Sequence, residues 1–199
     1  MTNFSKIALG AMVIGATAFF TSCNDDDSNS PPAEQSLYQK LGGTAMVQDP
    51  NAAAGVKIEA GRLSYRSVVD STITLIVADI VNGANGNLGA HFAPIAAEVF
   101  GPDMNSTNVA VLSDHLTDFF SFNTGGTNAV NTYSGLDMVS AHDPAINPRM
   151  GVKSTNANYD KFIGYVGAAA GLNGVTDPAL IGDVVAVLES LRDPIVQAQ

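Results

Sequence analysis

Apolar residues recur at steps of three and four over most of the chain beyond residue 36, which is the period of an α-helix. The clearest apolar stripe follows Asp177-Pro178, a helix start signal. It consists of Leu180, Ile181, Val184, Val185, Leu188, Leu191 and Ile195. A second stripe ends at the glycines of residues 171–174 and consists of Tyr159, Phe162, Ile163, Val166 and Ala170. The chain is therefore predicted to end as a hairpin of two long amphipathic helices.

Residues 62–78 are rich in β-branched side chains, whose propensity favours a strand. The length of the segment and its lack of turn residues favour a helix instead, and a helix is our prediction. Residues 82–108 are rich in Gly, Asn and Pro around a short apolar patch, so we expect a loop with one or two helical turns there. Few strands are expected anywhere in the chain.

Two shorter helices are predicted on either side of Gly125-Gly126, and each carries a histidine on its apolar side. In residues 108–120 one face carries Leu112, His115, Leu116, Phe119 and Phe120. In residues 133–142, Met138 and Val139 precede His142 by four and three positions, and Asp143-Pro144 ends the helix. Two imidazoles facing one hydrophobic space suggest a buried metal or haem. For either histidine alone, a neutral imidazole bonded to a carbonyl, or a cation at a helix C-terminus, is the better interpretation.

Residues 1–23 have the pattern of a bacterial lipoprotein signal peptide. Lys6 precedes an apolar run over residues 7–20, which is too short to span a membrane and ends just before Cys23. Cys23 is the one cysteine of the sequence, and lipidation at a new N-terminus explains it better than an incidental thiol does. Residues 24–35 hold three aspartates and two prolines and no large apolar residue, which predicts a disordered acidic tether. Residues 36–199 are then one folded domain.

The formal net charge of −10 argues against nucleic acid or anionic lipid as a partner. The acidic run after Cys23 resembles the export signals of surface lipoproteins in Bacteroidetes-type bacteria, although such linkers also serve solubility alone. We therefore expect a lipid-anchored protein of the cell envelope, in the outer membrane and exposed on its surface.

Three segments resemble truncated haemoglobins, a family with a short two-over-two form of the globin fold. Residues 37–43 (LYQKLGG) resemble the family's opening motif, and residues 119–126 (FFSFNTGG) resemble its aromatic pair and second glycine pair. Residues 133–142 (YSGLDMVSAH) resemble its YxGxxMxxxH motif. Tyr159 and Gly174-Val175 fit the family's last two helices. The resemblance covers most of residues 36–196, with insertions at 44–61 and 82–108, and it implies an all-α, truncated globin-like two-over-two fold with loop insertions.

The resemblance implies a haem b cofactor with His142 as the proximal iron ligand, its other ring nitrogen bonded to a nearby carbonyl. Phe92 matches a phenylalanine that packs on haem, although ordinary core packing would look the same. Arg149 and Lys153 are candidates to pair with haem propionates, or to be plainly solvated. The full set of implied haem-contacting residues is Ile73, Phe92, Leu112, Leu116, Phe120, Met138 and Arg149. His91 receives no role.

The distal positions that are often polar in this family fall here on Leu112 and Leu116, and a position that is often tyrosine falls near Ile73, beside Thr72. The distal pocket is therefore expected to be apolar. His115 is the alternative distal ligand, since some cyanobacterial relatives place an iron-binding histidine at this helix position. If His115 binds iron, the haem is six-coordinate; if it does not, dioxygen lacks a strong distal donor and is lost faster.

The leading prediction is a haem-binding lipoprotein that binds dioxygen, nitric oxide or another diatomic gas. Two alternatives stay open: a bis-histidyl electron-transfer or haem-scavenging protein with an envelope redox partner, and a structural lipoprotein on a globin scaffold without haem. An enzyme is not predicted, apart from nitric oxide dioxygenase-type or peroxidase-type side activity. The sequence contains no glycine-rich phosphate loop, and Asp114-His115 and His142-Asp143 are sequence neighbours that do not face each other on a helix.

Overall fold

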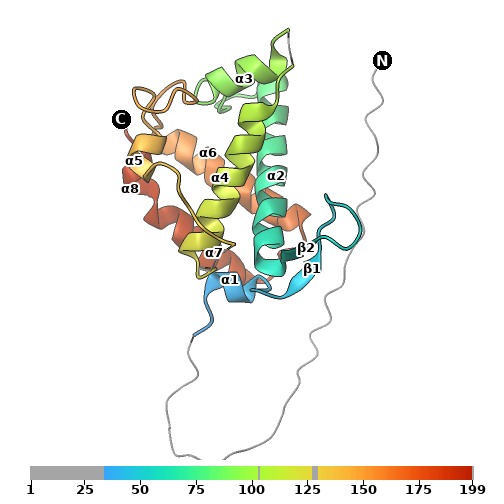
Figure 1. The fold of residues 1–199 in the computed structure, drawn as a ribbon. Helices are drawn as coiled ribbons and strands as arrows, with labels where there is room; N and C mark the ends of the chain where they lie inside the picture. The colour runs from blue at the N-terminus through green and yellow to red at the C-terminus, as the bar shows by residue number, and fades with distance from the viewer. Residues whose placement is uncertain (1–33, 103, 127–129, 199) are drawn as a thin grey trace, which may run out of the picture. The chain divides into compact units, whose positions relative to one another are not determined.

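Helices make up most of the chain that the computed structural model describes, which is residues 34–102, 104–126 and 130–198 (Figure 1). Cys23, the predicted leader and most of the predicted tether lie outside these residues. The helices are α1 (Leu37–Lys40), α2 (Ala60–Val81), α3 (Ala93–Phe100), α4 (Thr107–Asn123), α5 (Met138–Ala141), α6 (Asn156–Leu172), α7 (Pro178–Ser190) and α8 (Arg192–Ile195). A small hairpin of β1 (Met46–Gln48) and β2 (Lys57–Glu59) precedes α2. The expected all-α class is thus confirmed, and within the described residues no helix has the length and apolar content needed to cross a membrane.

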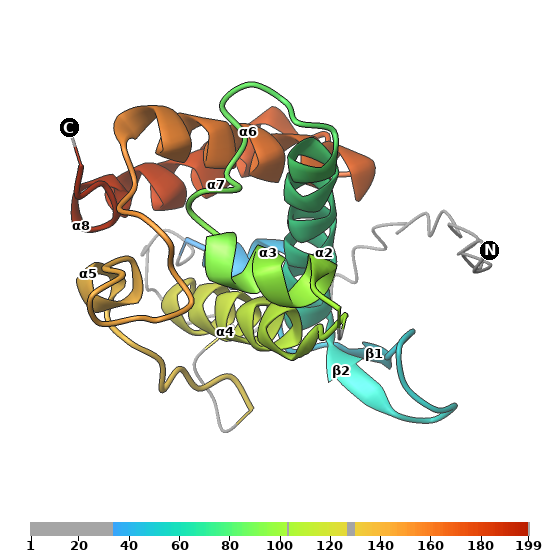
Figure 2. The same ribbon diagram turned by 90° about the horizontal axis from the view of Figure 1, so that it is seen from above.

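The long helix α2 lies between α4 on one side and α6 on the other, and α7 lies along α6 (Figures 1 and 2). The buried face of α2 follows steps of three and four and consists of Gly61, Tyr65, Val69, Thr72 and Ile76. The hydroxyl of Thr72 donates to the carbonyl of Val68 at 2.8 Å, so even this β-branched polar side chain is satisfied within the helix. The prediction of a helix over residues 62–78 is confirmed.

Residues 44–61 include an antiparallel hairpin, which the sequence did not predict. Val47 pairs with Ile58, and the strands have only three residues each. Strands this short cannot display a period-two pattern, which explains the missed prediction. Asp49 after β1 accepts two hydrogen bonds from the guanidinium of Arg66 on α2, at 2.6 and 3.0 Å, and these fix the hairpin to the helix. The insertion at 82–108 contains α3, eight residues long, in agreement with the expected loop with one or two helical turns.

The predicted helix over residues 133–142 is wrong in its extent. Only Met138–Ala141 is helical, and His142 is its C-terminal cap. Asp137 caps the N-terminus by accepting the backbone N–H of Ser140 at 3.0 Å. An aspartate that caps a helix has extended backbone, so the residues before it are held outside the helix.

The predicted C-terminal hairpin is confirmed in α6 and α7, although the last stripe forms two helices and not one. The helix α7 begins at Pro178 with the carboxylate of Asp177 accepting the N–H of Ala179 at 2.9 Å. Leu191 ends α7 and begins α8, whose third residue is Pro194. Proline has no N–H to donate to the preceding turn, so a continuous helix through this point is disfavoured.

Tyr38 of the LYQKLGG motif is completely buried and organises the packing of α1 against α2. A Cβ atom added at Gly61 would lie 2.9 Å from the Tyr38 ring, and one added at Gly126 would lie 2.7 Å from it. Only glycine allows the backbone to approach the ring this closely. The Tyr38 ring stacks on Tyr65 at 6.3 Å, and Tyr65 stacks on Phe120 at 5.9 Å. The motif is therefore connected to the C-terminal part of α4 by stacked rings.

Candidate functional site

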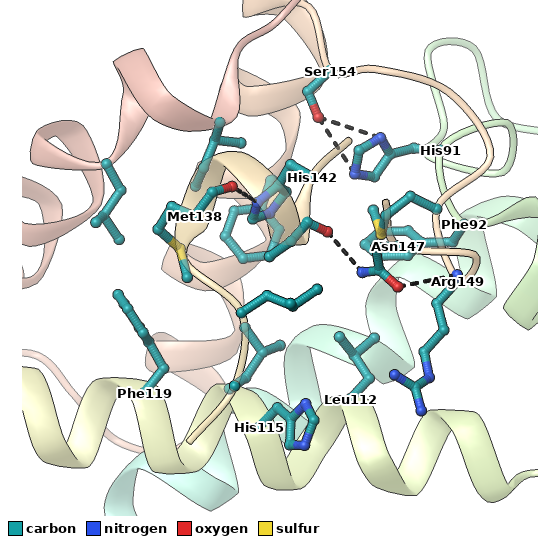
Figure 3. Close-up of a pocket in the computed structure, with 18 of the residues that line it drawn as sticks. His91, Phe92, Leu112, His115, Phe119, Met138, His142, Asn147, Arg149 and Ser154 are labelled. Carbon is teal, nitrogen blue, oxygen red and sulfur yellow. Dashed lines mark hydrogen bonds between the residues drawn. The ribbon is translucent and has the colours of Figure 1, made fainter. Parts of the chain in front are cut away.

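A cavity of about 400 Å³ opens between α4 and a wall formed by α5, the loop after it and the C-terminal helices (Figure 3). Eight of the residues singled out from the sequence line it: Phe92, Leu112, His115, Leu116, Phe120, Met138, His142 and Arg149. The structure thus brings together residues from distant parts of the chain in one mostly apolar space.

His142 follows α5 as its C-terminal cap, and its side chain lines the cavity (Figure 3). Its Nδ1 lies 2.8 Å from the carbonyl oxygen of Met138, one helical turn earlier. Since a carbonyl only accepts, Nδ1 carries the proton and Nε2 retains its lone pair. Burial lowers the pKa of His142 and so favours the neutral ring. The hydrogen bond to the Met138 carbonyl acts in the opposite direction but is the smaller effect. A neutral imidazole with a free Nε2 is the form that binds a metal ion.

The helix α4 presents different residues to the cavity and to α2. Leu112, Leu116 and Phe119 line the cavity, while Thr117 and Ser121 are buried on another face. His115 also lines the cavity but is exposed, and in Figure 3 its ring lies on α4 across the cavity from His142. The expected apolar character of the α4 face therefore agrees with the structure, with His115 at its exposed edge.

Arg149 lies at the edge of the cavity, held there by other polar side chains. Its Nε donates to the Oδ1 of Asn108 at 2.6 Å, and Asn108 in turn donates to a carboxylate oxygen of Glu98. The guanidinium is thus positioned beside the cavity, where a planar fork of donors suits a carboxylate. Lys153, the other cation suggested by the sequence, instead pairs with Asp143 at 3.2 Å.

Ile73 is not among the residues that line this cavity. It lines a separate cavity of about 40 Å³ between α2, α3 and α4. Phe92, Ile95 and Leu112 line both cavities, so Ile73 lies one layer of side chains away from the larger one. Thr72, beside it, is buried on α2.

His91 also lines the cavity, although no role was predicted for it from the sequence. It is 5% exposed and precedes α3. Its Nδ1 lies 2.9 Å from the carbonyl oxygen of Val152, and the hydroxyl of Ser154 lies 3.3 Å from both ring nitrogens. Its ring is 6.3 Å from that of His142, with an angle of 20° between the planes. These partners are about sixty residues away in sequence, so no local pattern could have identified His91.

We expect the haem-free protein to lose stability as the pH falls from 7 to 5. Burial, with a further contribution from His142, lowers the pKa of His91 to about 4, so the unfolded chain takes up a proton that the folded chain excludes. The contribution of His91 is present above its ordinary pKa near 6.5 and is lost as the pH falls toward 4. At pH 5 the loss is about 2 kcal/mol, measurable by urea unfolding at both pH values.

The matched variant for this prediction is His91→Phe, which keeps a buried ring but cannot titrate. Its stability should change clearly less between pH 7 and pH 5 than that of the unchanged protein. An equal change in both proteins would contradict a buried neutral His91.

No protein-family model matches this chain, and no curated protein is significantly similar to it. Within the described residues there is also no group of three or more His, Cys, Asp or Glu side chains that could hold a metal ion. A molecule bound in this cavity would therefore contact a few imidazoles in apolar surroundings, and not a cluster of carboxylates.

Proposed function

We propose that this chain binds haem b in the cavity between α4 and α5, with His142 as the proximal ligand, on a two-over-two globin fold. The observation that carries the proposal is His142 itself: its Nδ1 is occupied by the Met138 carbonyl at 2.8 Å, and its ring lines an apolar cavity of about 400 Å³. A metal-binding histidine is typically oriented through its second nitrogen in this way. The packing of α2 against both α4 and α6, with α7 against α6, is compatible with such a fold.

The other cavity residues fit a flat apolar ligand that carries carboxylates. Leu112, Leu116 and Phe119 on α4 would cover one face, and Met138 would contact the other beside His142. Arg149 at the edge would pair with a propionate while Asn108 holds its Nε. Bound haem would supply an iron ion that can bind dioxygen or nitric oxide. The leucines of α4 would exclude water from that iron but would donate no hydrogen bond to a bound gas.

A bis-histidyl protein for electron transfer or haem scavenging is the second candidate, and the position of His115 favours it. His115 lines the cavity from α4, across from His142, so its side chain is placed to compete for the iron (Figure 3). A gas would then bind only in the fraction of molecules in which His115 has left the iron. With Cys23 lipidated, either protein would act at the cell envelope.

Titration of haem into the purified protein tests the proposal. We expect one haem per chain and a Soret band that shifts as the iron is bound. A six-coordinate low-spin spectrum that becomes five-coordinate in His115→Ala supports the bis-histidyl candidate. A five-coordinate spectrum in the unchanged protein supports gas binding without competition. The absence of a Soret shift at any haem concentration overturns haem binding.

A further inference from the structure

His91 and His142 are two buried imidazoles on one wall of the cavity, and they are bonded in the same manner. Each directs Nδ1 to a backbone carbonyl, that of Val152 at 2.9 Å and that of Met138 at 2.8 Å. Each therefore keeps a lone pair on Nε2. A single buried histidine is adequately explained by its hydrogen bonds, but two such rings beside each other place two Nε2 lone pairs in one part of the cavity. The lone pair of His91 has the hydroxyl of Ser154 as a long hydrogen-bond partner at 3.3 Å, and a metal ion would have to replace this contact.

The separation of the rings suits one shared metal ion. Their centroids are 6.3 Å apart, with 20° between the ring planes. With metal–nitrogen bonds of about 2.0–2.1 Å, two imidazoles on one ion have centroids roughly 5 to 6.5 Å apart, the larger value belonging to a nearly linear arrangement. The observed distance of 6.3 Å lies at the nearly linear end of this range, so the distance between the rings allows both to reach one ion.

The surrounding side chains favour copper over other metals. The side chains of Met138 and Met150 line the same cavity, and Met150 is 7% exposed. Thioether sulfur selects Cu⁺, imidazole binds copper in both oxidation states, and Cu²⁺ has the highest affinity among the divalent ions for nitrogen ligands. A singly charged Cu⁺ ion also costs less to place in a largely apolar cavity than a doubly charged ion does.

We propose that the haem-free cavity is a copper site, in which the imidazoles of His91 and His142 bind one copper ion and a thioether of Met138 or Met150 assists. The hydroxyl of Ser154, 3.3 Å from the ring of His91, orients that ring at the site. One consequence rests on the proposed function: because His142 serves both ligands, copper and haem exclude each other. His115, on the opposite wall, takes no part.

The test uses the full chain, free of haem, and follows copper binding in two oxidation states. Cu²⁺ is followed by electron paramagnetic resonance, which detects coupling to coordinated nitrogen, and Cu⁺ by competition with a chromogenic chelator under reducing conditions. We expect one copper per chain, with affinity lowered more than about tenfold in His91→Phe and in His142→Phe, since even outer-shell partners contribute that much. His115→Phe removes the remaining histidine of the cavity and should lower copper affinity less than either of these variants does.

Equal copper affinity in the unchanged protein and in His91→Phe overturns the proposal, as does a loss that is largest in His115→Phe. The double variant Met138→Leu, Met150→Leu preserves the packing and should weaken Cu⁺ more than Cu²⁺; equal effects overturn the thioether contribution. If a histidine variant does not fold, nitrogen coupling in the unchanged protein and displacement of its copper by haem still test the site. Copper binding without haem binding would overturn only the proposed function, and haem binding without copper binding would overturn only this inference.

Discussion

We expect the His142→Gly variant to bind haem more than about a hundredfold more weakly than the unchanged chain. Partners that merely orient a metal-binding histidine contribute tenfold to a hundredfold to affinity, and removal of the ligand itself costs more. The ring that is lost is the one held by the Met138 carbonyl at 2.8 Å on the wall facing α4. Haem titrations of both proteins, followed at the Soret band, give the two dissociation constants.

Added imidazole provides the control for this experiment. The glycine variant leaves a space of the size and shape of the lost ring, so free imidazole should enter it and restore both affinity and spectrum. The circular dichroism of the variant should remain helical, because His142 caps a helix of only four residues. Unchanged haem affinity in the variant would remove His142 from the iron and leave the fold untouched.

We expect Tyr38→Ala to lower the free energy of unfolding by about 4 kcal/mol, a large part of the stability of an ordinary domain. Tyr38 is 0% exposed, and its ring fills the space left by Gly61 and Gly126. Its hydroxyl also donates to the buried carboxylate of Glu59 and accepts from the amide of Asn131 at 2.9 Å. The substitution therefore creates a cavity and removes a hydrogen-bond donor of a buried acid.

Urea unfolding of Tyr38→Ala and Tyr38→Phe separates these two contributions. The phenylalanine keeps the ring against both glycines and loses only the hydroxyl, so its loss should be about 1 to 2 kcal/mol. Equal losses in the two variants would show that the ring contributes little. Haem affinity should be nearly the same in both folded variants, because Tyr38 does not line the cavity.

The sequence predicted the long helices well because each has a repeated apolar face. The face from Tyr65 to Ile76 on α2 and the stripe on α6 follow the helical period over several turns. The same reasoning failed where elements are short. The three-residue strands of the hairpin and the four-residue α5 are fixed by pairing, by capping and by tertiary contact, and none of these produces a period.

Local motifs and helical faces predicted part of the candidate site. Met138 and His142 are four positions apart, and Leu112 and Leu116 share one face of α4, so their convergence could be anticipated. The side-chain layer that separates Ile73 from the cavity and the burial of His91 depend on how segments tens of residues apart in the sequence fold back together. Such contacts have no counterpart in a single sequence.

The wall of the cavity that carries His142 has a consequence for how a large ligand enters. A helix of four residues is not stable alone, and α5 depends on its Asp137 cap and on contacts with α8. Segments with so few internal contacts open at a lower free energy than the whole domain does. The α2 and α4 helices can therefore stay packed while this wall separates from them and closes again, so uptake and release of the proposed haem would be local unfolding events, faster than unfolding of the domain.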